Sequence, residues 1–335
     1  MKKFIVLVIF IALLFTSCGT SNTSSNKESG KKLEEVNLVL DWYPNAIHSF
    51  IYAAIENGYF EDEGIKVNIQ FPSNATDGLS LVAAGKATLG IDYPSNLIMS
   101  KAKENIPVKS VGAVVHSSLS ILMSLDEKKI KSPKDLEGKN VGYSGNPLNE
   151  EYVRTMVKQD GGDPNKVKFT DVGFEMLSAI MTKRVDSVSG ALVNHEVPVL
   201  EDKGYKVNYL NPSDYGVPRE YTMIFVANDK TINNDREKLE KFMRGAKRGF
   251  EFMKKNPDKA LEILLKNQQK DNFPLTESVE KKSMKILLPG MDSVEEPFLS
   301  QDKKHWEDNA KWLKEKGIID KIPSSDDLFV NILNK

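Results

Sequence analysis

Short apolar runs alternate with segments of helical periodicity along most of the chain. The apolar runs predict strands over 36–40, 65–71, 88–93, 108–115, 119–125, 140–143, 166–170, 187–193, 206–210 and 221–227. Helical periodicity predicts helices over 50–60, 73–85, 149–159, 235–254, 257–266, 276–287 and 301–316. Because strands that alternate with helices usually form largely parallel sheets, the pattern predicts an α/β fold.

One predicted helix, 235–254, carries a clear apolar face. Four side chains recur there at helical spacing: Phe242, Ala246, Phe250 and Met253. Such a stripe is typical of a helix that packs on a core, so these residues are predicted to be structural and not to contact a ligand.

The first residues predict an export signal. Lys2 and Lys3 precede an apolar run over 4–15, which is too short to span a bilayer and has the length of a signal sequence. Small residues then lead to Cys18, and this arrangement resembles a lipobox, in which the cysteine is lipidated. We therefore predict a signal peptide over 1–17 and a lipidated, flexible tether over 18–34. The alternative is an ordinary secretory signal with an incidental cysteine.

Composition narrows the classes of function. The chain has 335 residues with one cysteine, so the mature fold has no disulfide framework, cysteine zinc site or thiol nucleophile. Its 46 basic and 47 acidic residues nearly cancel, which argues against nucleic acid as a partner. About 300 residues after the tether exceed one ordinary core, so two lobes are expected. We expect no cofactor and no metal.

The first candidate site follows the strand predicted over 36–40. Asp41, Trp42 and Asn45 supply a carboxylate, an indole and an amide where that strand gives way to a helix. An indole can stack on a flat ring, while the carboxylate and amide can bind its exocyclic groups. His48 follows within one turn. The alternatives stay open: Trp42 fills the core, Asp41 caps the helix, and His48 is a structural hydrogen-bonding residue.

Further candidates follow other predicted strands. Open α/β sheets bind ligands in the crevice beyond the carboxyl ends of their strands. The residues at such positions are Tyr93, Asn96, Ser144, Gly145, Asn194 and Glu196, together with Tyr215, which lies before the apolar run over 221–227. None of these clusters contains an arginine, the residue that binders of anionic groups usually need. The set favours a neutral or amine-bearing aromatic heterocycle.

The sequences of these motifs resemble those of one family. "LDWYPN" at 40–45 and "YAAIENGYFEDEGIKV" at 52–67 resemble the opening of the thiamine-pyrimidine-synthase-like domain, and "GKATLGIDYPSN" at 85–96 and "SPKDLEGKNVGYSG" at 132–145 extend the likeness. The resemblance implies a type II periplasmic-binding-protein fold with a ligand cleft between two lobes. It implies lobe I over 35–127 plus 221–335 and lobe II over 128–220.

The same resemblance implies a function. ThiY-type lipoproteins of this family bind N-formyl-4-amino-5-aminomethyl-2-methylpyrimidine, or hydroxymethylpyrimidine, and deliver it to an ABC permease for thiamine salvage. A riboflavin-binding lipoprotein is the alternative, and nitrate, sulfonate and taurine binders resemble the fold more distantly. Fungal pyrimidine synthases share the domain but have a lysine and a histidine at the positions of Asp92 and Asn96. Without that lysine and histidine, an enzyme of their kind is not expected.

The expected mechanism is lobe closure. Ligand contacts with both lobes would shift the open–closed equilibrium, and the closed form would dock on the permease. The predicted partners are thus a small pyrimidine, the permease and the membrane, reached through the N-terminal lipid. The protein is expected to be a monomer on the extracytoplasmic face of the bacterial cell membrane.

Overall fold

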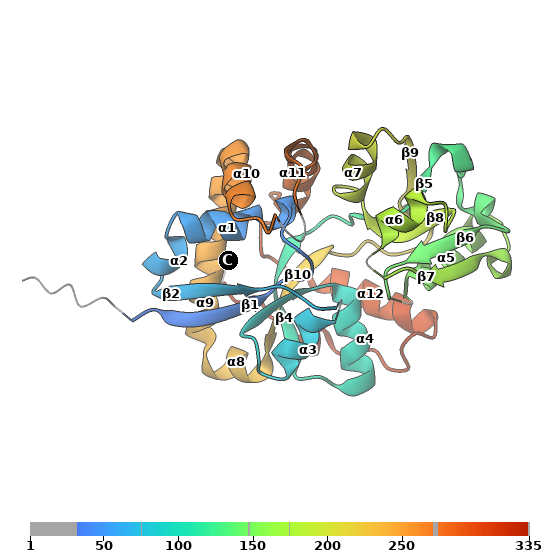
Figure 1. Ribbon diagram of the computed structural model, residues 1–335. Helices are drawn as coiled ribbons and strands as arrows, with labels where there is room; N and C mark the ends of the chain where they lie inside the picture. The colour runs from blue at the N-terminus through green and yellow to red at the C-terminus, as the bar shows by residue number, and fades with distance from the viewer. Residues whose placement is uncertain (1–31, 75, 147, 174, 271–273, 334–335) are drawn as a thin grey trace, which may run out of the picture. The chain divides into compact units, whose positions relative to one another are not determined.

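Two five-stranded mixed sheets organise the chain in the computed structural model, which describes residues 32–335 without 75, 147, 174, 271–273 and 334–335 (Figure 1). Leu33–Lys335 form one unit. The predicted signal peptide over 1–17, Cys18 and nearly all of the tether over 18–34 lie outside the described residues. Among the residues described, no helix is both long and apolar enough to cross a membrane.

The first sheet has the strand order β2-β1-β3-β10-β4. Its strands are β1 (Glu34–Val39), β2 (Ile65–Gln70), β3 (Leu89–Asp92), β4 (Val108–Val115) and β10 (Met223–Asn228). β1 is parallel to β2 and β3, whereas β10 lies antiparallel between β3 and β4. Ile224 pairs with Asp92, so β10 begins beside the place where β3 ends.

The second sheet repeats this arrangement in the order β7-β6-β8-β5-β9. Its strands are β5 (Ser120–Leu125), β6 (Asn140–Tyr143), β7 (Lys168–Asp171), β8 (Ser187–Leu192) and β9 (Val207–Leu210). β5 is antiparallel to both β8 and β9. The predicted lobe boundary at residue 128 had left β5 in lobe I, and the strand pairing corrects this because β5 belongs to the second sheet.

Helices cover both faces of the first sheet, and with it they form the first lobe. One layer contains α1 (Ser49–Glu56), α2 (Tyr59–Asp62), α9 (Arg236–Lys255), α10 (Pro257–Lys266) and α11 (Glu277–Met291). The other contains α3 (Asp77–Ala83), α4 (Pro94–Glu104), α8 (Asp229–Asn234), α12 (Lys303–Glu315) and α13 (Ser325–Leu328).

The second sheet and its own helices form the second lobe. They are α5 (Leu148–Gln159), α6 (Met176–Met181) and α7 (Glu196–Asp202). Short 3₁₀ turns complete the list of elements: η1 (Ala46–His48), η2 (Asp126–Lys128), η3 (Pro133–Leu136), η4 (Pro164–Lys166) and η5 (Pro212–Tyr215).

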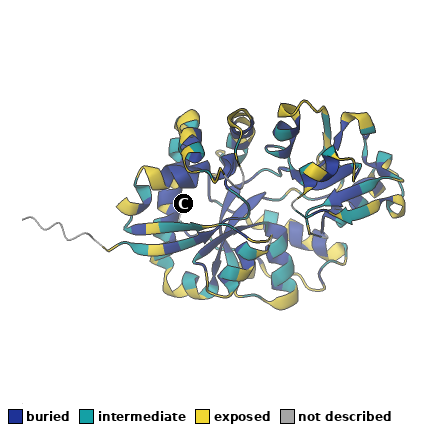
Figure 2. Ribbon diagram, viewed as in Figure 1, coloured by how far each residue is buried: buried dark blue, intermediate teal, exposed yellow. Residues whose placement is uncertain are grey.

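The core of the first lobe lies between its sheet and α9. The predicted apolar stripe is confirmed, since Phe242, Ala246, Phe250 and Met253 are fully buried. α9 approaches α1 closely at Gly249, where a Cβ would lie 2.2 Å from the Phe50 carbonyl oxygen. Only glycine permits that approach. Buried strands and helix faces occur in both lobes, and exposed residues lie on the outer turns (Figure 2).

Two segments cross between the lobes, 116–119 and 216–222, and we call them the hinge segments. The Thr222 hydroxyl donates to the Ser117 carbonyl at 2.6 Å and accepts from the Leu119 amide at 2.7 Å. Ser118 Oγ accepts from the Glu220 amide and donates to the Glu220 carbonyl, both at 2.9 Å. Side-chain hydroxyls thus fasten the two crossings to each other.

Candidate functional site

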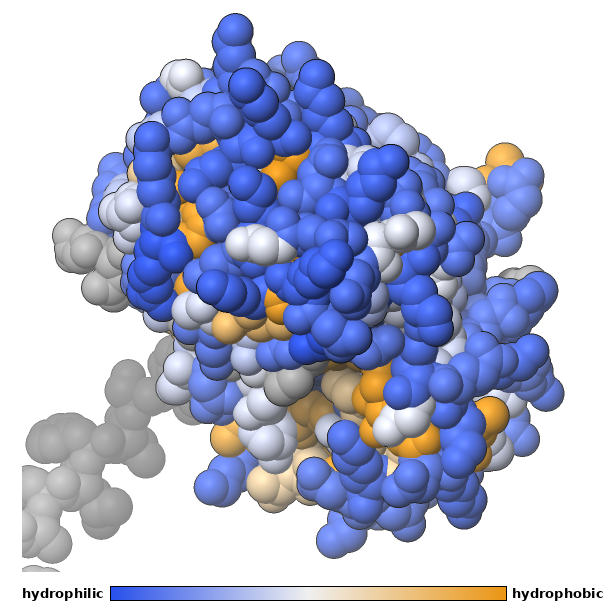
Figure 3. Space-filling model, turned by 90° about the vertical axis from the view of Figure 1, so that its right-hand side faces the viewer, coloured by the Kyte–Doolittle hydropathy of each residue, from blue (hydrophilic) through white to orange (hydrophobic). Residues whose placement is uncertain are grey.

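A cavity of about 540 Å³ is lined by residues from both lobes and from the hinge segments. The surface on the side of the second lobe is mainly hydrophilic, with hydrophobic residues around a hollow (Figure 3). Predicted site residues that line the cavity are Asp41, Trp42, Asn45, Tyr93, Asn96, Ser144, Gly145 and Glu196. They follow β1, β3, β6 and β8, so the carboxyl ends of parallel strands do converge on it.

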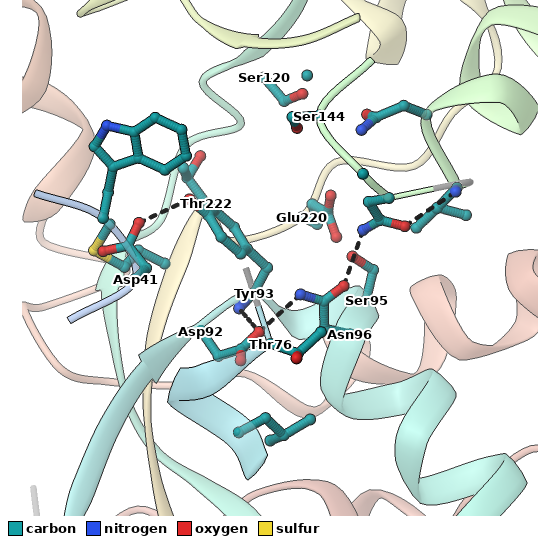
Figure 4. Close-up of a pocket in the computed structure, with 18 of the residues that line it drawn as sticks. Asp41, Thr76, Asp92, Tyr93, Ser95, Asn96, Ser120, Ser144, Glu220 and Thr222 are labelled. Carbon is teal, nitrogen blue, oxygen red and sulfur yellow. Dashed lines mark hydrogen bonds between the residues drawn. The ribbon is translucent and has the colours of Figure 1, made fainter. Parts of the chain in front are cut away.

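Asp41 and Tyr93 form a hydrogen-bonded part of the cavity wall (Figure 4). The Tyr93 hydroxyl donates to Asp41 Oδ2 at 2.8 Å, and His48 Nε2 lies 3.0 Å from Asp41 Oδ1. His48 Nδ1 is 3.3 Å from the Asn45 amide, which donates to it. The proton of a neutral His48 therefore lies on Nε2 and is donated to Asp41, which fixes the carboxylate against the cavity.

The strand-to-helix turn after β1 is held by its own side chains. Asn45 Oδ1 accepts from the Ile47 amide at 3.1 Å and caps η1. Glu280 Oε2, on α11, accepts from the Ala46 amide at 2.7 Å. Trp42 lies in this turn, half-buried, and lines the cavity. Because hydrogen bonds hold the turn at Asp41 and at residues 45–47, the backbone on both sides of Trp42 is fixed, and the indole can stack on a flat ring from a defined position.

Asp92 ends β3 and has a structural role as well as a place on the cavity wall. Its Oδ1 accepts from the Tyr93 amide at 2.7 Å and from Asn96 Nδ2 at 2.9 Å. Burial raises the pKa of Asp92 to about 7, against the lowering effect of those two donors. Asn96 Oδ1 in turn accepts from Asn146 Nδ2 at 2.9 Å, which joins the first lobe to the second across the cavity.

Glu196 begins α7 and is also committed to the backbone. Its Oε2 accepts from the Leu192 amide at 2.7 Å, and the side chain is only 7% exposed. A carboxylate in the first turn of a helix is favoured by the free N–H groups there. Glu196 is thus held in place with one oxygen bonded to the fold.

Three predicted site residues do not line the cavity. His48 is fully buried behind Asp41 and orients it. Asn194 points away, donating from Nδ2 to Ser283 Oγ on α11 at 3.0 Å, while the adjacent His195 lines the cavity instead. Tyr215 ends η5, where it packs against the cluster around Tyr152 and Trp312. Strand-end position alone cannot show which way each side chain points.

A second group of polar residues was missed. Glu220 and Ser120 line the cavity together with Ser95, Tyr152 and Thr222 (Figure 4). The Tyr152 hydroxyl donates to Glu220 Oε1 at 3.0 Å. Burial raises the pKa of Glu220 to about 7, although the hydroxyls of Tyr152 and Ser95 lower it.

The cavity is acidic. Its acidic residues are Asp41, Asp92, Glu104, Glu196 and Glu220, whereas its lining, within the described part of the chain, includes neither lysine nor arginine. An anionic ligand would meet uncompensated repulsion there, while amines and ring N–H groups would find acceptors. The described residues also contain no group of three histidine, cysteine or acidic side chains placed to hold a metal ion.

The fold defines a class of protein. The ligand-binding component of an ABC-type import system from Staphylococcus aureus is similar, with a TM-score of 0.67 and 15% identity over 89% of this chain and 97% of that one. Both are two-lobed periplasmic binding-protein folds.

A sequence model of the NMT1/THI5-like family matches residues 45–260, and the chain belongs to that family. A formylaminopyrimidine-binding protein from Halalkalibacterium halodurans is 42% identical over 99% of both chains. A 4-amino-5-hydroxymethyl-2-methylpyrimidine phosphate synthase from Legionella pneumophila is 24% identical over 85% of this chain and 87% of its own. The predicted family resemblance is confirmed.

Proposed function

We propose that this protein is the substrate-binding lipoprotein of an ABC importer that captures a thiamine pyrimidine precursor. The observation that carries the proposal is the acidic, arginine-free cavity with Trp42 and Tyr93 on its wall and Asp41 fixed between Tyr93 and His48. It suits an aminopyrimidine better than a sulfonate or an amino acid. The 42% identity to a formylaminopyrimidine-binding protein supports the same ligand.

The pyrimidine ring would stack against Trp42 and Tyr93, with its exocyclic amine at Asp41 or Glu196. These side chains come from the two lobes, so a ligand that touches both favours the closed arrangement. The hydrogen bond between Asn96 and Asn146 would add to closure from the protein itself. Delivery to a permease then requires reopening and no covalent chemistry.

Synthase chemistry is not part of the proposal. The positions that hold a lysine and a histidine in the resembling fungal enzymes are Asp92 and Asn96 here, and these two side chains bond each other at 2.9 Å. In the described chain, no lysine lines the cavity to form a Schiff base. The relation to the Legionella synthase, at 24% identity, is compatible with a shared domain and a different use of the cavity.

Calorimetric titration of the tether-trimmed protein tests the proposal. The ligands are the formylaminopyrimidine, hydroxymethylpyrimidine, thiamine and riboflavin. We expect submicromolar binding of a pyrimidine and no comparable binding of riboflavin. Tight riboflavin binding would instead assign flavin uptake, for which a cavity of about 540 Å³ also leaves room. Absence of binding to all four would reject both.

The anchor is proposed on Cys18 and needs its own test. Cells fed a labelled fatty acid should incorporate it into the wild-type protein and not into Cys18→Ser. The variant should appear in the medium or the soluble fraction. Equal labelling of both would reject the anchor and leave the ligand proposal unaffected.

A further inference from the structure

The hinge wall of the cavity holds a carboxylate that the proposed binding of the ring does not use. Glu220 lies in the second hinge segment, directly before β10, and lines the cavity. Its backbone is clamped on both sides by Ser118 Oγ, which bonds its amide and its carbonyl. The side chain therefore projects from a fixed point between the lobes.

The hydrogen bonds of Glu220 differ from those of Asp41, Asp92 and Glu196. Asp41 and Asp92 each accept two hydrogen bonds, and Glu196 accepts from the backbone amide of Leu192, the last residue of β8. Glu220 accepts from Tyr152 at Oε1, and Oε2 makes no hydrogen bond of good geometry in the described protein, although the Ser95 hydroxyl lies close enough to the carboxylate to lower its pKa. A desolvated carboxylate oxygen without a donor is costly, and a ligand N–H can supply one.

The surroundings of Glu220 suit a polar side chain of a ligand. In the view of Figure 4, Glu220 is on the other side of Tyr93 from Asp41, and the labelled hydroxyls on its side are those of Ser95, Ser120 and Ser144. A ring stacked near Trp42 would thus direct its substituent toward Glu220 and these hydroxyls.

We infer that Glu220 is a specificity-determining residue that accepts a hydrogen bond from an N–H group, neutral or charged, on the ligand's side chain. This inference rests on the proposed function, since it takes the ring to lie at Trp42 and Tyr93. It adds a second recognition point on the hinge. Glu220 binds the substituent of the ligand there, while Trp42 and Tyr93 bind the ring. Ligands with a donor at that position are favoured over those with a methyl group.

The test compares two pyrimidines that differ in that donor. N-formyl-4-amino-5-aminomethyl-2-methylpyrimidine carries a side-chain N–H, and 4-amino-2,5-dimethylpyrimidine carries only a methyl group. Both are titrated calorimetrically at pH 8 into wild type, Glu220→Gln and Glu220→Asp. The matched control is Glu262→Gln, an exposed residue of α10 that does not line the cavity.

For Glu220→Gln, affinity for the formylated ligand should fall roughly ten- to a hundredfold, the usual weight of a hydrogen bond to a charged group. Affinity for the dimethyl ligand should change less than about twofold on the same grounds. Glu220→Asp keeps the negative charge but moves the carboxylate away from the ligand. It should therefore lose affinity for the formylated ligand and not for the dimethyl ligand, as Glu220→Gln does. The control Glu262→Gln should match wild type with both ligands.

Equal losses for both ligands would show that Glu220 only shapes the cavity and would overturn the inference, as would no loss for either. Both results leave the proposed function standing. If wild type binds neither pyrimidine, the proposed function fails and this inference fails with it.

Discussion

The two walls of the cavity hold their carboxylates differently. After β1 and β3, Asp41 accepts from Tyr93 and His48, so each of its oxygens already has one donor from the protein and the carboxylate is held in place, with acceptor capacity left for a ligand. On the hinge, Glu220 accepts from Tyr152 at one oxygen only. The first wall is preorganised before a ligand arrives, whereas the second is completed by one. Rigidity and discrimination can thus be placed on separate residues within one cavity.

The largest expected effect comes from breaking the preorganised wall. Asp41→Ala leaves the Tyr93 hydroxyl and His48 Nε2–H without their acceptor, which should lower the free energy of unfolding by about 2–4 kcal/mol. Urea denaturation measures this. Asp62→Ala, which removes only an exposed ion pair with Arg248, should cost less than about 1 kcal/mol. Equal losses in the two variants would show that Asp41 is not the organising group.

Substitution of Glu220 in the hinge wall should raise the free energy of unfolding, whereas Asp41→Ala lowers it. Burial raises the pKa of Glu220 from 4.5 to about 7, so the folded protein binds this proton more tightly than the unfolded chain does. The stability from the neutral carboxyl is complete below about pH 4.5 and is lost as the pH rises through about 7. Glu220→Gln should therefore stabilise the ligand-free protein by about 1–3 kcal/mol at pH 8 and by less at pH 4.5.

Denaturation of wild type and Glu220→Gln at both pH values checks this prediction. Asp92 titrates in the same range, but it is present in both proteins and cancels in the difference. A stability difference that does not depend on pH would contradict the proposed state of Glu220. A gain in the free energy of unfolding of Glu220→Gln, together with its loss of ligand affinity, would show that the charged Glu220 destabilises the ligand-free protein and is stabilised by a bound ligand.

Trp42→Ala tests the ring-binding part of the first wall. Affinity for the pyrimidine should fall by about tenfold or more, which is 1.4 kcal/mol, because the stacking face is lost. The melting temperature should stay near that of wild type, since Trp42 is half-buried. Unchanged affinity, or loss of the fold, would count against stacking. Trp306→Phe, in the buried core of the first lobe, offers a contrast that should act on stability instead.

The smallest expected effect concerns closure between the lobes. Asn146→Ala removes the donor to Asn96 Oδ1 and should weaken ligand binding by about two- to tenfold, mainly through faster dissociation. Stopped-flow measurement of release separates this from a change in association. Asn267→Ala, whose amide bonds only its own helix, should leave release unchanged. A change in association alone would contradict a role in holding the lobes together.

The sequence predicted one class of cavity-lining residue and missed another for a geometric reason. Asp41, Tyr93 and Glu196 follow parallel strands, and the rule that ligands bind beyond the carboxyl ends of strands finds them. Glu220 and Ser120 instead precede or begin the antiparallel strands β10 and β5. Because Ile224 pairs with Asp92 and Ser120 with Leu192, those strand starts reach the same edge. Strand direction is a property of pairing, which a single sequence does not display.

The fold was more predictable than the orientation of single side chains. The alternation of apolar runs and helical periods indicated the strands and most helices, because burial acts on whole elements. The side chains of His48 and Asn194 were placed in the site by position alone. His48 instead bonds Asp41 across a tight turn, and Asn194 bonds Ser283, which is distant in the chain. Both contacts depend on how the elements pack.

The place of β10 in the first sheet has a consequence for the order of folding. β10 lies between β3 and β4, so β4 has no partner in its sheet until residues 223–228 are available. The five strands of the second sheet all fall within residues 120–210 and pair only with one another, although Trp312 later packs against Tyr152 of this lobe. Because a chain is made from its N-terminus, the second sheet can be completed before β10 is available to the first sheet. The second lobe, whose sequence is inserted within that of the first, can therefore assemble first. The first sheet, begun by β1 to β4, is completed only when β10 is added.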